Sequence, residues 1–403
     1  MSGIVIIGAG HAAGQAAASL RQAKYEGDIT IIGDEAHIPY QRPPLSKAYL
    51  KGEQSADKVY LRAESFYADR NITMKLNTTA TAIDTAAKTV ALNTDETLSY
   101  DHLLISTGSR PRKLSIEGSD LPGTHYLRTM DDVDGLRDGM RPDANLVIVG
   151  GGYIGLEVAA VGRELGMNVH VLEMEERILQ RVTTPQMSAY YHQLHEGRGV
   201  HIHTSTGVTG FAGDGKVEEV ICGDQRFAAD IVIVGIGIIA NTELAEAAGI
   251  HCDNGIVVDE HCRTSDPFVY AAGDCTNHPN PLLDRRLRLE SVPNAMDQAR
   301  VSTANMLGDE KTYAAIPWFW SDQYDVKLQI AGLNSGYDNV VTRQGAEGAV
   351  SFWYYTGDQL VAVDAMNDPR AYMVAKRLIE AGKTADKTVV ANPGADLKPL
   401  LKA

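Results

Sequence analysis

The chain has 403 residues, of which 44% are hydrophobic and 22% are charged, and its formal net charge is −15. This length exceeds one compact core, so we expect several domains of an ordinary globular protein. The acidic balance argues against general nucleic-acid binding, which needs a basic face. The first apolar run leads into a glycine turn, and no apolar run approaches the ~18 residues of a membrane span. We therefore expect a cytoplasmic protein without membrane contact.

The cysteines and histidines show no spacing typical of a metal site. Cys222, Cys252, Cys262 and Cys275 lack C-x-x-C spacing, which argues against structural zinc, a thioredoxin-like motif or a disulfide framework. The twelve histidines show no H-E-x-x-H or comparable pattern. We therefore predict no metal site.

One strand–turn–helix–strand pattern occurs twice. It spans residues 3–35 (GIVIIGAGHAAGQAAASLRQA, then DITIIGDE) and residues 145–176 (NLVIVGGGYIGLEVAAVGRELG, then NVHVLEMEE). Each copy has an apolar strand, a glycine turn, an Ala-rich helical stretch and a second apolar strand that ends in an acid. Strands that alternate with helices predict parallel, doubly wound sheets.

The remaining segments complete the expected α/β architecture. Residues 101–111, 229–241 and 266–275 predict further buried strands that end in glycine turns. From about Tyr313, aromatic and alternating apolar residues predict antiparallel strands, followed by a helix over 371–382. The sequence thus predicts two doubly wound, glutathione-reductase-like dinucleotide-binding domains and a C-terminal α+β domain. The expected boundaries are 1–112 and 237–312 for the two parts of the first domain, 113–236 for the second and 313–403 for the third.

The first glycine motif predicts a pyrophosphate site. Gly8 and Gly10 match the first two glycines of G-x-G-x-x-G, and Ala13 replaces the third, which the motif tolerates. The glycines allow a tight turn and let a pyrophosphate approach the positive end of the following helix. Asp34 and Glu35 end the next strand, where a ribose diol would be hydrogen-bonded.

The second glycine motif is a full match through Gly150, Gly152 and Gly155, and Glu173 stands 23 residues after Gly150. A carboxylate at this position accepts a hydrogen bond from the 2′-hydroxyl of an adenosine ribose and repels a 2′-phosphate. NADH is therefore favoured over NADPH, although Arg177 lies nearby in the sequence and leaves the phosphorylated cofactor open.

Two such motifs in one chain suggest two dinucleotides. If one is NADH, a hydride donor, the usual acceptor is FAD. STGSRP, which contains Thr107 and Gly108, resembles the A-T-G-x-x-P turn of two-dinucleotide flavoproteins. TSDP followed by AAGD, which contains Asp274, resembles their second flavin motif, whose aspartate holds the ribityl chain.

Nearly the whole chain resembles the ferredoxin reductases of bacterial oxygenase systems, including those of aromatic-ring dioxygenases. The resemblance is carried by PYQRPPLSKAYL, GGGYIGLEVAA, TSDPFVYAAGDC, RLESVPNAMDQAR and PWFWSDQYDVKLQIAGL. One departure is Ala240, where the family usually has proline.

The resemblance implies roles for individual residues. It implies an FAD site lined by Ala12, Asp34, Lys47, Ala80, Arg128, Asp274 and Val292 and supported by Arg42, with Ile154 and Gly237 completing the cofactor-binding set. Lys47 would lie near the reactive edge of the flavin and pair with Glu157, because a cation there stabilises the negative charge of a reduced flavin. Tyr153 would cover the flavin until nicotinamide displaces it, and Trp320 would stack near its other side.

The resemblance further implies that NADH gives a hydride to FAD and that the electrons then pass singly to a 2Fe–2S ferredoxin. That ferredoxin would serve a haem-thiolate monooxygenase or a Rieske dioxygenase, and the similarity leans towards the haem system. Such ferredoxins are generally acidic, so we expect docking through Arg285, Arg286, Arg288 and Arg300. The alternative is an arginine cluster that only solvates its helix and loop. We expect a monomer.

Two other functions stay open at this point. A flavin NADH oxidase, peroxidase or disulfide reductase needs a redox cysteine on the first helix or its following loop, and no cysteine precedes Cys222. A redox-sensing flavoprotein similar to apoptosis-inducing factor often carries a basic nucleic-acid surface or a targeting segment, and the net charge of −15 argues otherwise.

Overall fold

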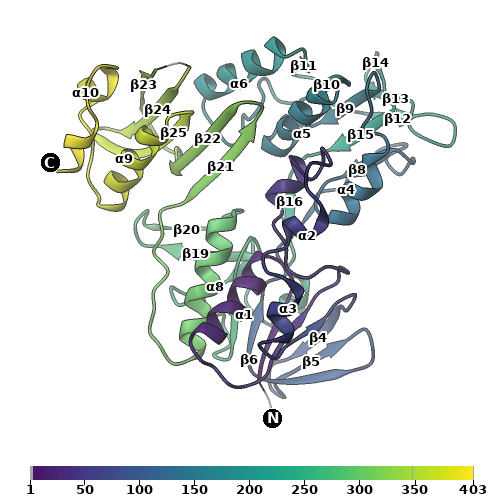
Figure 1. Ribbon diagram of the computed structural model, residues 1–403, viewed down its shortest axis with the longest axis vertical. Coiled ribbons are helices and arrows are strands. Elements are labelled where there is room, and N and C mark those ends of the chain that lie inside the picture. The colour runs from purple at the N-terminus through teal and green to yellow at the C-terminus, as the bar shows by residue number, and fades with distance from the viewer. Residues whose placement is uncertain (1–2, 347, 403) are drawn as a thin grey trace. The chain divides into compact units, whose positions relative to one another are not determined.

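The computed structural model describes residues 3–346 and 348–402, which form two compact units (Figure 1). Unit 1 consists of the residues up to Gln41, Ala56–Arg110 and Ile239–Phe319. Unit 2 consists of Arg42–Ser55, Pro111–Ile238 and the residues from Trp320 onward. Two short strands, β7 (Ser109–Pro111) and β16 (Ile238–Ala240), lie where the chain passes from one unit to the other.

Unit 1 is built on a largely parallel sheet with the strand order β3-β2-β1-β6-β5-β4, and β18 also pairs with β6. Strands β1, β2, β3, β6 and β18 are parallel, whereas β4, β5 and β6 form an antiparallel meander. The bounds are β1 (Gly3–Ile7), β2 (Ile29–Ile32), β3 (Ile72–Lys75), β4 (Ala80–Asp84), β5 (Thr89–Leu92), β6 (Thr97–Ile105) and β18 (Val269–Ala271).

Apolar side chains fill both faces of this sheet. Ile4 and Ile6 pack with α1 (His11–Gln22) and α8 (Val292–Met306), which lie side by side in Figure 1, and Val5 and Ile7 belong to the opposite core. A parallel sheet covered on both faces requires continuous apolar strands, which explains GIVII. The other elements of unit 1 are α2 (Ala56–Val59), α3 (Glu64–Ala68), α7 (Glu243–Ala247), β17 (Ile256–Val257), β19 (Thr276–Asn280) and β20 (Arg285–Leu287).

Unit 2 repeats the same design around a five-stranded parallel sheet with the order β11-β10-β9-β15-β8. Its elements are β8 (Thr124–Tyr126), β9 (Asn145–Val149), β10 (Asn168–Leu172), β11 (His201–His203), β15 (Ile231–Val234), η1 (Pro43–Ser46), α4 (Met130–Arg137), α5 (Tyr153–Glu164) and α6 (Pro185–Gly197). A smaller antiparallel sheet contains β12 (Gly210–Ala212), β13 (Glu219–Cys222) and β14 (Gln225–Ala228).

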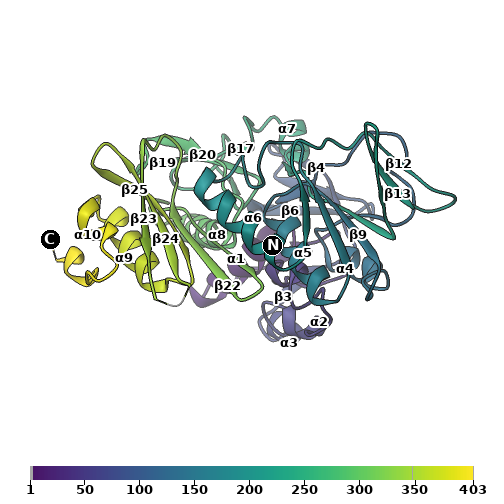
Figure 2. The ribbon, with the colours of Figure 1, turned by 90° about the horizontal axis from the view of Figure 1, so that it is seen from above.

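The C-terminal part of unit 2 is a five-stranded sheet with the order β21-β22-β25-β24-β23, and α9 packs against β22 and β25 (Figure 2). The pairs β22–β25, β25–β24 and β24–β23 are antiparallel. The bounds are β21 (Trp318–Gln323), β22 (Val326–Gly332), β23 (Asn339–Gln344), β24 (Val350–Thr356), β25 (Gln359–Met366), α9 (Pro369–Glu380), α10 (Lys387–Ala391) and η2 (Lys398–Leu401).

The predicted α/β fold class and the antiparallel C-terminal segment with its helix are confirmed. One core unites the C-terminal sheet with the second nucleotide-binding segment, since Leu156 and Tyr191 belong to the same buried cluster as Leu328 and Tyr354. The sequence did not indicate this union. The three-domain boundaries stay a prediction. Within residues 3–346 and 348–402, no helix has the length and apolar character needed to cross a membrane.

A buried histidine in unit 1 predicts a pH dependence of stability. His278 on β19 is fully buried edge-on to Tyr313, and neither ring nitrogen has a hydrogen-bond partner in the described part of the chain. Burial lowers the pKa of His278 to about 4. The unfolded chain therefore takes up a proton below about pH 6.5 that the folded chain refuses, so stability falls as pH drops from 6.5 towards 4.

We expect His278→Phe to weaken this pH dependence. Between pH 7 and pH 5 its free energy of unfolding should fall by about 2 kcal/mol less than that of the wild type. Urea unfolding at the two pH values measures the difference. An unchanged pH dependence would contradict the assignment of a neutral buried imidazole.

Candidate functional site

Each unit places one glycine turn where the strand order of its parallel sheet reverses. In unit 1 the turn follows β1, which is flanked by β2 and β6, and in unit 2 it follows β9, which is flanked by β10 and β15. Helices α1 and α5 begin directly after these turns. Doubly wound sheets bind their ligands at this switch point.

The first glycine of each motif is required by backbone conformation and by close approach. Gly8 has φ +106° and Gly150 has φ +108°, a region that side chains rarely adopt. A Cβ on Gly8 would lie 2.2 Å from the Ser106 carbonyl oxygen, and one on Gly150 would lie 2.4 Å from that of Gly235. Any larger residue would therefore push the turn away from the neighbouring strand.

The second glycine of each motif leaves space for a ligand. Gly10 and Gly152 are the N-caps of α1 and α5, and apart from the adjoining residues no atom of the described chain lies within 4 Å of a Cβ built on either. Among the described residues, neither helix has a side-chain cap or an acid in its first turn. Each helix dipole therefore points at open space, which suits a pyrophosphate.

The third position differs between the two motifs. A Cβ on Gly155 would lie 2.2 Å from the Gly150 carbonyl oxygen, so only glycine allows α5 to pack this closely on its turn. In unit 1 the equivalent residue, Ala13, is fully buried in the core of α1. The structure thus accommodates the alanine that interrupts the first motif.

In unit 2, two backbone amides orient the carboxylate of Glu173 so that it can bind a ribose diol. Its Oε2 accepts a hydrogen bond from the Gly151 amide at 2.8 Å, and its Oε1 accepts one from the Glu175 amide at 2.9 Å. Both bonds orient the carboxylate beside the glycine turn, and each oxygen keeps a further lone pair for a hydroxyl. The guanidinium of Arg177 instead donates to the Ser188 hydroxyl and the Gln180 carbonyl.

The corresponding acids of unit 1 follow β2. Asp34 is exposed, and the Glu35 carboxylate accepts a hydrogen bond from the Tyr40 hydroxyl at 2.5 Å. Either acid could bind a ribose diol. The geometry gives Glu35 the more fixed orientation, because a buried tyrosine holds it.

The two flavin-motif turns of unit 1 are joined by hydrogen bonds. The Thr107 hydroxyl donates to the Asn241 carbonyl at 2.7 Å, and the Asn241 amide donates back to the Thr107 carbonyl at 2.9 Å. The Ser109 hydroxyl donates to the Asp274 carboxylate at 2.9 Å. Gly108, between them, has φ +63°. Sequence reasoning missed Ser109, which stands in STGSRP, and Asn241, which ends the predicted strand segment 229–241.

Small residues and one spare donor border the same region of unit 1. Gly273, with φ +94°, would place a Cβ 3.8 Å from that of Ala12 and 3.6 Å from that of Ala295. Gln298 Oε1 accepts from the Gly273 amide at 2.8 Å, and its buried Nε2 has no partner within the described residues. A narrow, small-residue cradle with an unused buried donor fits a polar cofactor such as FAD. Ala80 begins β4 and Val292 begins α8.

Lys47 and Glu157 form a hydrogen-bonded charged cluster in unit 2. Glu157 lies on α5 and is only 3% exposed, so it is not a solvated helix acid. Its Oε2 accepts from Lys47 Nζ at 2.6 Å and from the Ser46 hydroxyl at 2.5 Å. Its Oε1 accepts from the Ser321 hydroxyl at 2.6 Å. The predicted ion pair is present, and two serines that sequence reasoning missed complete it.

The signal for these serines was present but ambiguous. Ser46 directly precedes Lys47, and Ser321 alternates with Trp320 in the strand WFWSDQ. Alternation places Ser321 and Trp320 on opposite faces of β21. A polar residue on the inward face of a buried strand needs a partner, but the sequence does not say which.

The other predicted residues of unit 2 lie as follows. Arg42 donates to the Arg128 carbonyl at 2.6 Å. Tyr153 begins α5 and packs against the cluster that unites the two segments of unit 2, and burial raises the pKa of its hydroxyl well above the usual range. Ile154 is 47% exposed, and Gly237, with φ +102°, follows β15.

Comparison with known proteins identifies the family. Residues 2–299 match the pyridine nucleotide-disulphide oxidoreductase family, and residues 318–401 match the reductase C-terminal domain. The chain belongs to the pyridine nucleotide-disulphide oxidoreductase family. It is 42% identical over 408 residues to putidaredoxin reductase of Pseudomonas putida, with 99% of this chain and 97% of that protein covered.

Two further similarities agree with this family assignment. The chain is 41% identical over 402 residues to the ferredoxin–NAD(+) reductase component of the anthranilate 1,2-dioxygenase system of Burkholderia cepacia, with 98% of each chain covered. The crystal structure of the covalent putidaredoxin reductase–putidaredoxin complex matches with a TM-score of 0.96 at 42% identity and covers 100% of this chain and 98% of that one.

These relatives confirm the resemblance to the ferredoxin reductases of oxygenase systems. As a member of this oxidoreductase family, the protein binds FAD and uses NAD(P)H. The relatives favour a ferredoxin reductase over the oxidase, disulfide-reductase and redox-sensor alternatives. Cys262 and Cys275 are completely buried, and burial raises the pKa of Cys275 to about 11, as expected for a packed thiol.

Within the described ranges, no group of three or more histidine, cysteine or acidic side chains could hold a metal ion.

The four arginines proposed for docking all belong to unit 1. Arg286 donates to the Val258 and Asn277 carbonyls, Arg288 pairs with Glu290 at 2.6 Å, and Arg300 pairs with Asp297 at 2.5 Å.

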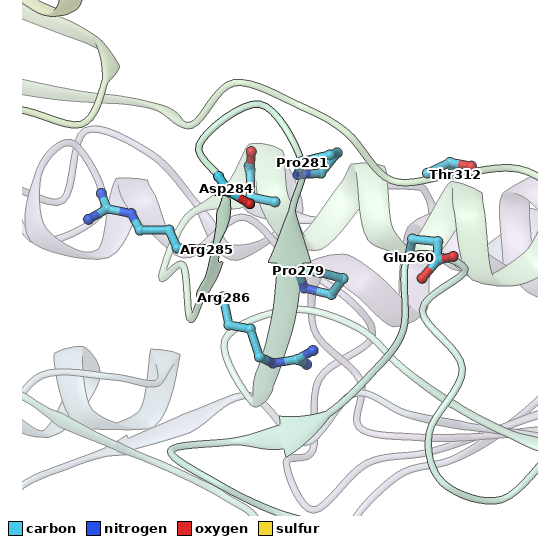
Figure 3. A pocket seen from close by; sticks show the side chains of 8 residues that line it. Glu260, Pro279, Pro281, Asp284, Arg285, Arg286 and Thr312 are labelled. Atoms are coloured by element: carbon cyan, nitrogen blue, oxygen red, sulfur yellow. The ribbon is translucent and has the colours of Figure 1, made fainter.

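Arg285 and Arg286 extend in opposite directions from β20 (Figure 3). They border a pocket of about 490 Å³ that is lined by Glu260, Pro279, Asn280, Pro281, Asp284, Arg285, Arg286 and Thr312. The acceptors of Arg286 are neutral carbonyls, so this arginine keeps its full positive charge. The carboxylates beside Arg288 and Arg300 partly offset theirs.

Proposed function

We propose that the protein passes electrons from NADH through FAD to a 2Fe–2S ferredoxin that serves an oxygenase, either a haem-thiolate monooxygenase or a Rieske dioxygenase. The observation that carries the proposal is the ion pair between Lys47, in the loop after β2, and Glu157 on α5, in a chain whose first cysteine is Cys222. A loop with a lysine in place of a redox cysteine supports direct electron transfer from the flavin to a protein partner. NADH-dependent reduction of cytochrome c, with and without candidate ferredoxins, tests this function.

The residues of the chain have separable tasks in this function. FAD held by this chain would supply the chemistry that links a two-electron donor to a one-electron acceptor. Gly10 and Gly152 leave room for the two pyrophosphates, and Glu173 selects NADH because its carboxylate repels a 2′-phosphate. The ammonium of Lys47 stabilises negative charge at the flavin, and Glu157 fixes its position.

The proposed domains follow from these tasks. Residues 1–112 and 237–312 would bind FAD, residues 113–236 would bind NADH, and residues 313–403 would form the C-terminal domain. The glycine turns after β1 and β9 support the two nucleotide assignments. We further propose that the protein is a monomer.

We propose that Arg285, Arg286, Arg288 and Arg300 form the docking patch for the acidic ferredoxin. Arg300→Glu is expected to lower kcat/KM for ferredoxin about tenfold at low salt and to flatten its salt dependence, since steering charges act mainly on association. Reduction of ferricyanide by NADH should stay unchanged. Steady-state kinetics at several salt concentrations give all three quantities.

Arg226→Glu provides the matched control. Arg226 is an exposed arginine on β14 that pairs with Glu219 at 2.7 Å, much as Arg300 pairs with Asp297. The control should keep wild-type ferredoxin kinetics. Parallel loss of the ferredoxin and ferricyanide activities in Arg300→Glu would count against a docking role.

A further inference from the structure

A chain of buried hydrogen bonds ends at Oε1 of Glu157, whereas Lys47 binds Oε2 of the same carboxylate. Ser321 and Gln323 are both almost fully buried and lie two residues apart, on one face of β21. Gln323 Nε2 donates to Ser321 Oγ at 3.2 Å, and Gln323 Oε1 lies 2.7 Å from His195 Nε2 on α6. The chain therefore runs from α6 through β21 to α5, entirely within unit 2.

The donors of this chain all point towards Glu157. Glu157 Oε1 can only accept from Ser321, so the Ser321 hydroxyl donates there and accepts from the Gln323 amide nitrogen. The Gln323 amide oxygen must then accept from His195 Nε2–H. Burial lowers the pKa of His195 to about 4, so the ring is neutral near pH 7 and its Nδ1 accepts from the Tyr324 hydroxyl at 3.4 Å.

This common direction has two consequences for the cluster. Each bond places a positive hydrogen nearer to the carboxylate, so the chain stabilises the negative charge of Glu157. The chain also fixes the rotation of the Ser321 hydroxyl, because its oxygen accepts from Gln323 while its hydrogen is donated to Glu157. An amide donates through nitrogen and accepts through oxygen, so Gln323 fixes orientation and does not relay protons.

The opposite side of the carboxylate is fixed by the loop that carries Lys47. The ammonium of Lys47 lies 3.3 Å from the Pro43 carbonyl and 3.4 Å from Ser46 Oγ, besides its bond to Glu157. With Ser46 on one oxygen and Ser321 on the other, the carboxylate has one hydrogen-bonded orientation. The position of the Lys47 ammonium depends on that orientation.

We propose that Ser321 and Gln323 are positioning residues, which hold Glu157 as the fixed, charged partner of Lys47 and thereby set the rate at which NADH reduces the flavin. This inference rests on the proposed role of the Lys47–Glu157 pair at the flavin. It adds Ser321 and Gln323 of β21, which act on Lys47 through Glu157.

The test measures rapid flavin reduction and the midpoint potential of the bound FAD in the holoprotein. Ser321→Ala leaves the buried Oε1 of Glu157 without its donor, so the limiting reduction rate at saturating NADH should fall about tenfold. The dissociation constant of NADH should stay unchanged, and the potential should become more negative. Ser321→Thr keeps the hydroxyl and should restore both the rate and the potential.

Two further variants make the test specific. Gln323→Met keeps a similar volume but removes the donor to Ser321, so we expect a several-fold slower reduction, smaller than for Ser321→Ala. Ser351→Ala is the matched control, because Ser351 is also a fully buried serine of the C-terminal sheet, where it accepts from Trp353 Nε1 at 3.0 Å. The control should keep the wild-type rate and potential.

Wild-type rates and potentials in Ser321→Ala and Gln323→Met would overturn the inference. Equal losses in Ser351→Ala would overturn it as well, since they would indicate a general effect of buried hydroxyls. If Ser321→Ala loses FAD, the reduction rate and the potential of Gln323→Met decide whether the inference holds. Ferredoxin reduction by the wild type is assayed separately, so its absence would reject the proposed acceptor without touching this test.

Discussion

Replacing Gly152 by valine is expected to leave FAD bound and to raise the dissociation constant of NADH at least about a hundredfold, equivalent to ~2.7 kcal/mol. The backbone of Gly152 is extended (φ −79°, ψ 177°), so valine fits its conformation. Apart from the adjoining residues, no atom of the described chain lies within 4 Å of the new Cβ, so the protein itself accommodates the side chain. The valine would instead fill the space left for the pyrophosphate.

Gly10→Val is the complementary variant. Gly10 occupies the same position in unit 1 (φ −93°, ψ −159°) and has the same open surroundings in the described structure. We expect a folded protein that purifies without flavin. Absorbance of bound FAD and reduction by dithionite separate the two results: Gly152→Val should be yellow, be reduced normally by dithionite and need a far higher concentration of NADH for reduction.

Gly135→Val controls for the introduction of valine at an open glycine. Gly135 lies on α4, and its added Cβ likewise meets no described atom within 4 Å. The control should keep both flavin and NADH activity, with a small loss of stability from the lower helix propensity of valine. Normal NADH reduction of Gly152→Val would reject the assignment of the second glycine turn.

Lys47→Ala is expected to slow flavin reduction by NADH about a hundredfold while FAD stays bound. The estimate follows from the loss of one preorganised electrostatic contact at a reacting centre. The variant also leaves the buried Glu157 with two hydroxyl donors and no cation. Rapid mixing with NADH, monitored at the flavin absorbance, gives the rate.

Lys51→Ala is a close control for this variant. Lys51 lies four residues further along the same loop and pairs with Glu164 of the same helix α5. Its ion pair is more exposed, with 25% and 35% of the two side chains accessible, so its removal should have little effect. A Lys47→Ala protein that binds FAD and reduces at the wild-type rate would remove Lys47 from the mechanism.

The glycine turns could be predicted from the sequence because their causes are local. The required φ of Gly8 and Gly150, the strand before each and the helix after each are encoded within about thirty residues. Glu173 is predictable for the same reason, since its place at the end of β10 follows from the βαβ pattern.

The surroundings of Glu157 could not be predicted, because they come from distant parts of the chain. A sequence alone does not distinguish a buried acid on this helix from a solvated one. The burial of Glu157 depends on the packing of η1 and β21 against α5, and these segments lie about 110 residues before it and 160 residues after it. Local patterns do not report such contacts.

The most direct test of the central claim is an anaerobic titration of the protein with NADH in the presence of excess oxidised 2Fe–2S ferredoxin. We expect two molecules of ferredoxin to be reduced for each NADH oxidised, because the electrons leave the flavin singly. We also expect the same ratio after the thiols are blocked. NADH oxidation that reduces no ferredoxin, or that stops when the thiols are blocked, would contradict this claim.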